Sequence, residues 1–111
     1  MTKALAHRVI SRADVFQAIA DPTRRAILDR LRQGPAPVNS LASGFSVSRP
    51  AISKHLRILR EADMVREERH GRERVYQLHP ERLKEIDDWI LAYRDFWQTS
   101  LNRLKSYLEE K

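Results

Sequence analysis

The chain contains no cysteine, which excludes disulfide bonds and thiolate chemistry. It has only three glycines among 111 residues, and neither a glycine-rich phosphate loop nor a G-x-S-x-G turn is present. Ser53 and His55 lie two residues apart on an expected helix, so their side chains point in different directions. We therefore expect no enzymatic activity and no catalytic residues.

Long apolar runs are also missing, and none approaches the length needed to cross a membrane. Near the N-terminus, His7, Arg8 and Arg12 interrupt the apolar residues, so the segment lacks the core of a signal peptide. These absences predict a cytoplasmic protein with no membrane partner.

What the chain does have is positive charge, with 21 lysines and arginines against 15 acidic residues and a formal net charge of +6. Residues 38–79 hold eight basic residues against five acidic ones, whereas residues 80–111 hold six against seven. A basic surface indicates nucleic acid or another polyanion as partner, although membrane headgroups would also attract it. The length predicts a single domain over residues 1–111.

The segment 38–62 shows two short helical patterns separated by a sharp turn. Val38, Leu41, Ala42 and Phe45 recur at helical spacing. The segment from Gly44 to Val47 supplies the small and polar residues that a sharp connection needs. Ser48 is a suitable N-cap for a second helix, and Pro50 is tolerated in its first turn. This arrangement predicts a helix-turn-helix.

The expected second helix has two different faces. Its apolar stripe is formed by Ile52, His55, Leu56 and Leu59. We interpret His55 as structural, with a backbone group rather than a metal as its partner. The opposite face is polar and basic, and the residues that we expect to contact DNA there are Ser48, Arg49, Pro50, Ser53, Lys54 and Arg57.

A basic β-hairpin is expected after this helix, over residues 65–78. Two strand-like runs, Val65 to Glu68 and Arg74 to Leu78, flank a connection with Gly71 at its centre. Arg69, Arg72 and Arg74 are candidates for phosphate or minor-groove contacts, with the alternative that only one of them touches DNA. The pattern predicts a mainly α fold with a small β-hairpin, a winged helix-turn-helix of about five helices.

Three blocks of sequence carry a resemblance to a known family: Ala20 to Leu28, Ser53 to Ala62, and Gly71 to Tyr76. In order and spacing they resemble the bacterial ArsR-type winged helix-turn-helix repressors, specifically the members without metal-binding cysteines. The resemblance spans roughly residues 12 to 100. It implies a homodimeric transcriptional repressor that binds an inverted repeat.

Two helices are expected ahead of the helix-turn-helix. Ser11 is a suitable cap for the first, with inward residues Val15, Phe16 and Ile19. Asp21 is a suitable cap for the second, with Pro22 at its first position and inward residues Ile27, Leu28 and Leu31. Arg24 and Arg25 lie in the first turn of this second helix, where they could touch phosphate, pair with a carboxylate or remain solvated.

A long last helix is expected over residues 80–109. Its apolar residues follow spacings of three and four over more than three heptads, a seam that Trp89 and Phe96 broaden. We expect the seam to pack partly on the first helix and partly on a second copy, giving a two-fold dimer. The expected interface residues are Phe16, Ile86, Ile90, Tyr93, Trp97, Leu101, Leu104 and Leu108.

The sequence departs from the resembled family where that family often binds a metal effector. The positions that hold metal-binding cysteines in many relatives are Pro37 and Asn39 here, and no histidine follows His79 on the last helix. We therefore expect no metal and no other cofactor. Two modes of control stay open: autoregulation through the protein's own concentration, or an apolar small-molecule effector against Trp89, Tyr93, Phe96 and Trp97.

Together these patterns predict a sequence-specific, DNA-binding transcriptional regulator that acts as a homodimeric repressor on a palindromic operator. The alternative is a winged-helix module that binds a protein or structured RNA without specific DNA readout.

Overall fold

Capping side chains define where the main helices begin in the computed structural model, which describes residues 14–110. The Asp21 carboxylate accepts a hydrogen bond of 3.0 Å from the backbone N–H of Arg24, at the start of α3 (Pro22–Leu31). The Ser48 hydroxyl accepts one of 3.3 Å from Ala51, at the start of α5 (Arg49–Glu61). Each satisfies an N–H that has no partner within its helix. Both predicted starts are confirmed.

The helix before α3 is short. α2 spans Val15–Ala18 and is capped by Asp14; the expected cap, Ser11, lies outside the described residues, as does the N-terminal segment in which we looked for a signal peptide. Val15 is buried, as expected. Phe16 is not, because its side chain is 39% exposed and lies on the side of α2 that faces α6. The prediction that Phe16 points into the core is therefore wrong.

The helix-turn-helix consists of α4 (Val38–Ser43) followed by α5. Leu41 of α4 and the apolar stripe of α5, formed by Ile52, Leu56 and Leu59, are almost fully buried. Burial of this stripe holds α5 against the body while leaving its opposite face exposed. The core that they join also contains Val15, Ala18, Ile27, Leu28, Leu31, Ala36, Ala62, Met64, Val65 and Tyr76.

A three-stranded antiparallel sheet has the order β1-β3-β2. β2 (Val65–His70) and β3 (Glu73–Leu78) form the wing, and each is longer than the sequence pattern indicated. The expected five-residue connection is in fact a two-residue turn, in which Gly71 adopts a φ of 65° that favours glycine. The third strand, β1 (Ala36–Pro37), was not predicted; it pairs with Tyr76 and Val75 of β3.

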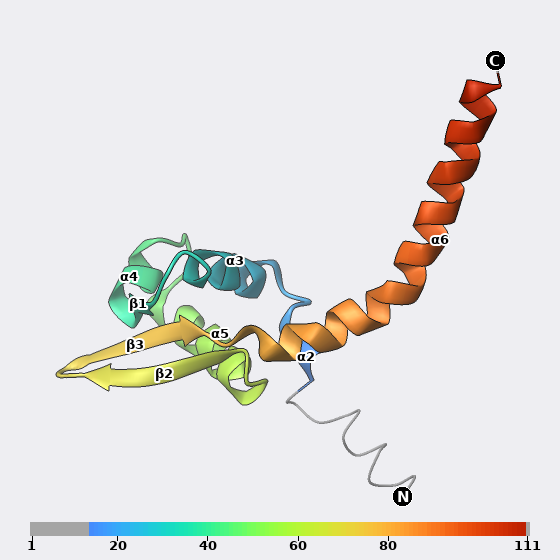
Figure 1. Cartoon of the computed structure of the whole chain (residues 1–111). Coiled ribbons are helices and arrows are strands. Elements are labelled where there is room, and N and C mark those ends of the chain that lie inside the picture. The colour runs from blue at the N-terminus through green and yellow to red at the C-terminus, as the bar shows by residue number, and fades with distance from the viewer. Residues whose placement is uncertain (1–13, 111) are drawn as a thin grey trace, which may run out of the picture.

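The chain ends in a short 3-10 turn, η1 (Pro80–Arg82), followed by the 27-residue helix α6 (Leu83–Glu109). Figure 1 shows α6 and the wing extending in different directions from the helix-turn-helix. No helix within residues 14–110 is long and apolar enough to cross a membrane. With five α-helices in the described part and a small antiparallel sheet, the predicted winged helix-turn-helix fold is confirmed.

Candidate nucleic-acid interface

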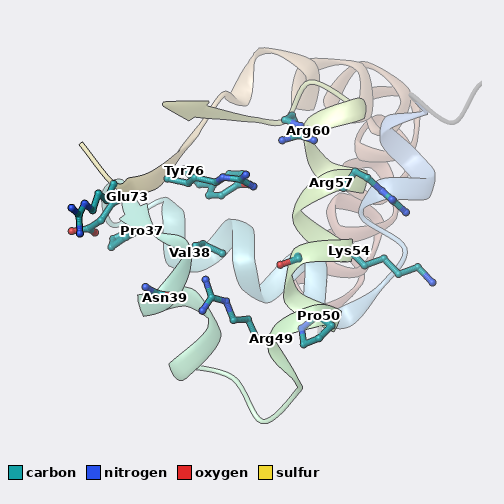
Figure 2. Close-up of a pocket in the computed structure, with 13 residues that line it drawn as sticks. Pro37, Val38, Asn39, Arg49, Pro50, Lys54, Arg57, Arg60, Glu73 and Tyr76 are labelled. Carbon is teal, nitrogen blue, oxygen red and sulfur yellow. The ribbon is translucent and has the colours of Figure 1, made fainter. Parts of the chain in front are cut away.

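An open groove of about 790 Å³ lies between α5, the N-terminal end of α4 and the wing. Figure 2 shows the side chains that line it. Seven of the nine expected DNA-contacting residues lie along this groove: Arg49, Pro50, Ser53, Lys54, Arg57, Arg72 and Arg74. The fold therefore brings the polar face of α5 and the basic part of the wing to one surface.

Three cations of α5, Arg49, Lys54 and Arg57, are exposed to solvent and free to contact a ligand. Arg49 extends toward α4, whereas Lys54 and Arg57 extend along the opposite flank of α5 (Figure 2). None of these three side chains forms an ion pair within residues 14–110, and each is classed as exposed. Exposed, unpaired cations on a helix are suited to contact the phosphates and base edges of a DNA major groove.

The wing contributes Arg72 from its turn and Arg74 from β3. Arg69 stands directly opposite Arg74 in the register, but it does not line the groove. Ser48 also lies outside the groove lining, where it serves as the cap of α5. These two residues thus adjoin groove residues, Arg74 and Arg49, without lining the groove themselves.

Six residues line the groove although the sequence did not predict them to contact DNA. They are Pro37, Val38, Asn39, Arg60, Glu73 and Tyr76. Arg60 was within reach of sequence reasoning, because it follows Arg57 by three residues on the same face of α5. Asn39 and Tyr76 were not, because only the packing of α4 and β3 in the fold brings them beside α5.

A hydrogen-bonded network joins the end of α5 to the wing. Oε2 of Glu67 accepts a hydrogen bond of 2.6 Å from the Tyr76 hydroxyl and one of 2.8 Å from Nη1 of Arg60. The hydroxyl's hydrogen bond, together with the attraction of Arg60, holds the pKa of the Glu67 carboxyl below its ordinary value of 4.5. Burial and the same carboxylate raise the pKa of Tyr76 to about 12.

His55 faces the body of the protein and has side-chain partners. Its Nδ1 lies 3.3 Å from Nη1 of Arg24 and 3.8 Å from Oδ2 of Asp21. The expected backbone partner is therefore wrong, although a structural position on the packed side of α5 is consistent with the prediction. A guanidinium only donates hydrogen bonds, so Nδ1 accepts in the contact with Arg24, whereas the contact with the Asp21 carboxylate requires a proton on the same nitrogen; the ring tautomer decides between the two.

Arg24 and Arg25 bind backbone carbonyl groups at the end of α2, which is none of the expected roles. Nε of Arg24 donates to the Ala18 carbonyl at 2.7 Å, and its Nη2 donates to that of Gln17 at 3.1 Å. Nη1 of Arg25 donates to the carbonyl of Ile19 at 2.8 Å. Cations at a helix C-terminus satisfy carbonyls that have no partner within the helix.

The expected dimer seam on α6 is largely exposed in the single chain. Ile86 packs against the chain's own core and Ile90 is half-buried. The other seam residues of α6, Tyr93, Trp97, Leu101, Leu104 and Leu108, are 49–60% exposed. Near the base of the helix, Phe16 meets Trp89 edge-to-face, with ring centroids 5.7 Å apart. A stripe of this size outside the core is unusual for a surface without a partner.

No group of three or more potential metal ligands gathers within the part of the chain that the structure describes.

The chain is similar in sequence to known helix-turn-helix proteins. A model described as a helix-turn-helix domain matches residues 19–68. The transcriptional repressor SdpR of Bacillus subtilis is 40% identical over 80 residues, which cover 72% of this chain and 89% of SdpR. The HTH-type transcriptional regulator Rv2034 of Mycobacterium tuberculosis is 52% identical over 65 residues, 59% of this chain and 61% of that protein.

The fold has solved counterparts as well. The crystal structure of an ArsR family transcriptional regulator superposes with a TM-score of 0.67 and 37% sequence identity, covering 75% of this chain and 91% of that one. The residues 19–68 that the helix-turn-helix model matches include α4 and α5, which form one wall of the groove. The chain belongs to the ArsR family of winged helix-turn-helix transcriptional regulators.

Proposed function

We propose that this regulator is a homodimeric repressor that binds an inverted-repeat operator through the groove between α5 and the wing. The observation that carries the proposal is that one surface collects the unpaired cations of the recognition helix and of the wing. The name of the similar SdpR, a transcriptional repressor, supports repression as the outcome of binding.

In this proposal α5 enters the major groove. Arg49 and Arg57 read base edges, since arginine forms bidentate hydrogen bonds with guanine. Ser48, Pro50, Ser53 and Lys54 complete the contact surface of α5, with Lys54 on phosphate. In the wing, Arg69, Arg72 and Arg74 contact phosphates or the minor groove beside the helix.

The proposed organisation is one DNA-binding domain, with the helix-turn-helix at residues 38–62, the wing at 65–78 and the dimerisation helix at 80–109. The exposed apolar stripe of α6 supports this, because a second copy would cover it. Two recognition helices related by a two-fold axis require half-sites about one helical turn, on the order of 10 base pairs, apart. A protein that remains monomeric at micromolar concentration contradicts this arrangement.

We propose two alternative modes by which DNA binding is controlled. One is autoregulation through the protein's own concentration, and the other is an apolar effector that binds to the aromatic residues of α6. The proposed location is the cytoplasm, where the DNA is found.

The direct experiment is a gel-shift titration of the protein with the duplex of its own promoter region and with random duplex, over a series of salt concentrations. Retention of the promoter duplex in excess of random duplex, with a steep salt dependence, supports the proposal. Arg30→Ala is a suitable control variant, because Arg30 is an exposed cation of α3 that does not line the groove. Absence of any duplex binding would instead favour a module for protein or RNA partners.

A further inference from the structure

The wing is attached to α5 through a carboxylate that lies among cations. Glu67 is on β2, and its two hydrogen-bond donors come from different elements: Arg60 from the last turn of α5 and Tyr76 from β3. In the sheet register Glu67 stands opposite Tyr76, so the pair spans the two strands of the wing. One carboxylate oxygen therefore connects the recognition helix with both strands.

Burial distinguishes this network from an ordinary surface ion pair. Tyr76 is only 5% exposed and belongs to the hydrophobic core, while the Glu67 side chain is 26% exposed. A hydrogen bond to a charged group is stronger than one between neutral groups, and a sheltered one is less weakened by water and salt. The Glu67–Tyr76 part of the network is thus sheltered, while the Arg60 side chain that links it to α5 is 46% exposed. The network joins the groove's two walls at the place where they meet.

The position of the network also decides where the wing arginines lie. Arg74 precedes Tyr76 by two residues on β3, so both side chains project from the same face of the strand. Arg60 and Tyr76 themselves line the groove, together with Arg74. A change in the angle between the wing and α5 would therefore move Arg72 and Arg74 relative to Arg57.

We infer that Arg60, Glu67 and Tyr76 are positioning residues for DNA binding, and that they fix the wing against α5 so that both engage one duplex at once. The inference rests on the proposed function for the identity of the ligand. It assigns to Glu67 a role opposite to the one that its charge suggests, because a carboxylate beside a polyanion is otherwise unfavourable.

The two effects of Glu67 predict opposite changes in DNA affinity when it is replaced. Glu67→Ala removes one negative charge next to the groove, so electrostatics alone predicts tighter binding to duplex DNA. Positioning predicts that Glu67→Ala binds more weakly, by about tenfold, the effect of losing one charge-assisted hydrogen bond. Glu73→Ala is the matched control: it removes the same charge from the groove lining. Within residues 14–110 Glu73 takes no part in the hydrogen bonds that join Arg60, Glu67 and Tyr76, so its loss is expected to tighten binding about twofold.

Tyr76→Phe provides a second variant that changes no charge. It is expected to weaken binding and to reduce the salt dependence, as if a wing arginine had lost its phosphate. In a double variant with Arg74→Ala, Tyr76→Phe should cause little further loss of DNA affinity. In a double variant with Arg49→Ala, the two losses of affinity should add. Full additivity with Arg74→Ala would overturn the inference, as would tighter binding by Glu67→Ala.

A measurement without DNA separates this inference from the proposed function. Because the chain has no cysteine, spin labels can be placed at Ser46→Cys in the helix-turn-helix turn and His70→Cys in the wing. Labelled protein is diluted with unlabelled protein, so that the measured distances lie within one chain of the proposed dimer. Each variant is first checked for folding by circular dichroism. A narrow distance distribution that broadens with Tyr76→Phe or Glu67→Ala, but not with Glu73→Ala, supports positioning even if no duplex binds. An unchanged distribution in both variants overturns it.

Discussion

Arg69 and Arg74 stand directly opposite each other on the two strands of the wing. Side chains at opposed positions of an antiparallel pair lie on the same face, close enough for like charges to destabilise the pair. Neither guanidinium forms an ion pair within residues 14–110, and both are exposed. Glu67 attracts Arg74 without forming an ion pair with it, so the fold neutralises the positive charge of the wing only in part.

Replacing one of these arginines should stabilise the protein while weakening its binding to DNA. Arg69→Thr removes the repulsion and adds a residue that favours strands, so we expect a gain of about 0.2–1 kcal/mol in the free energy of unfolding. The gain should shrink at high salt, where charges are screened. Chemical denaturation at two salt concentrations measures it, and a loss of stability at low salt would contradict the repulsion argument.

The helix and the wing should differ in what their cations contribute. Arg57→Ala is expected to reduce affinity for the operator more than affinity for random duplex, by about 1–3 kcal/mol of discrimination if Arg57 reads a base. Arg72→Ala is expected to weaken both by similar factors and to lower the salt slope by about one. Fluorescence anisotropy with the two duplexes measures these effects, and equal losses of specificity for both variants would argue against the division.

Arg24 should matter more for stability than its neighbour does. Its guanidinium contacts two carbonyls of α2 and the ring of His55, whereas that of Arg25 contacts the carbonyls of Ile19 and Ala20 from an exposed position. We expect Arg24→Ala to lower the free energy of unfolding by about 1–3 kcal/mol and Arg25→Ala by less. Urea denaturation of both variants measures the difference, and a larger effect at Arg25 would show that the contacts of Arg24 carry little stability.

Acid should destabilise the fold through two carboxylates. The N-cap hydrogen bond from Arg24 lowers the pKa of Asp21 from 3.8, and the Tyr76 hydroxyl lowers that of Glu67 from 4.5. Each group therefore contributes stability that is complete above its ordinary pKa and is lost as pH falls through the lowered value. Tyr76 acts in the other direction, since its pKa is raised to about 12: its contribution is complete below pH 10 and is lost as pH rises through about 12.

The loss of stability in acid is measured as the midpoint of urea unfolding at a series of pH values from 7 downward. Asp21→Asn retains a capping side chain but does not titrate, so its midpoint should fall less steeply below pH 4 than that of the unaltered protein. Identical pH profiles for the two proteins would exclude Asp21 as a source of the acid sensitivity.

Local signals made much of the fold predictable from sequence. The α5 helix was predictable because its cap, Ser48, and its apolar stripe are all encoded within a few residues. The wing was recognisable from two strand-like runs around Gly71, but its turn was placed too broadly, because strand ends depend on pairing with the partner strand. β1 is two residues long and carries no periodicity, so only its pairing with β3 defines it.

The site was predictable to the extent that it lies on α5. The network of Arg60, Glu67 and Tyr76 was not, since it requires knowing which face of the wing meets the helix. The carbonyl contacts of Arg24 were hidden for a similar reason. They depend on how the chain turns between α2 and α3, which no spacing in the sequence encodes.

Enrichment of duplexes from a random-sequence library by the 111-residue chain tests the central claim most directly. The account predicts that the selected duplexes share an inverted repeat, with half-sites about one helical turn, on the order of 10 base pairs, between their centres. It also predicts that Arg57→Ala weakens the enrichment, while Arg30→Ala leaves it intact. Failure to enrich any sequence, or enrichment of a single site without two-fold symmetry, would contradict it.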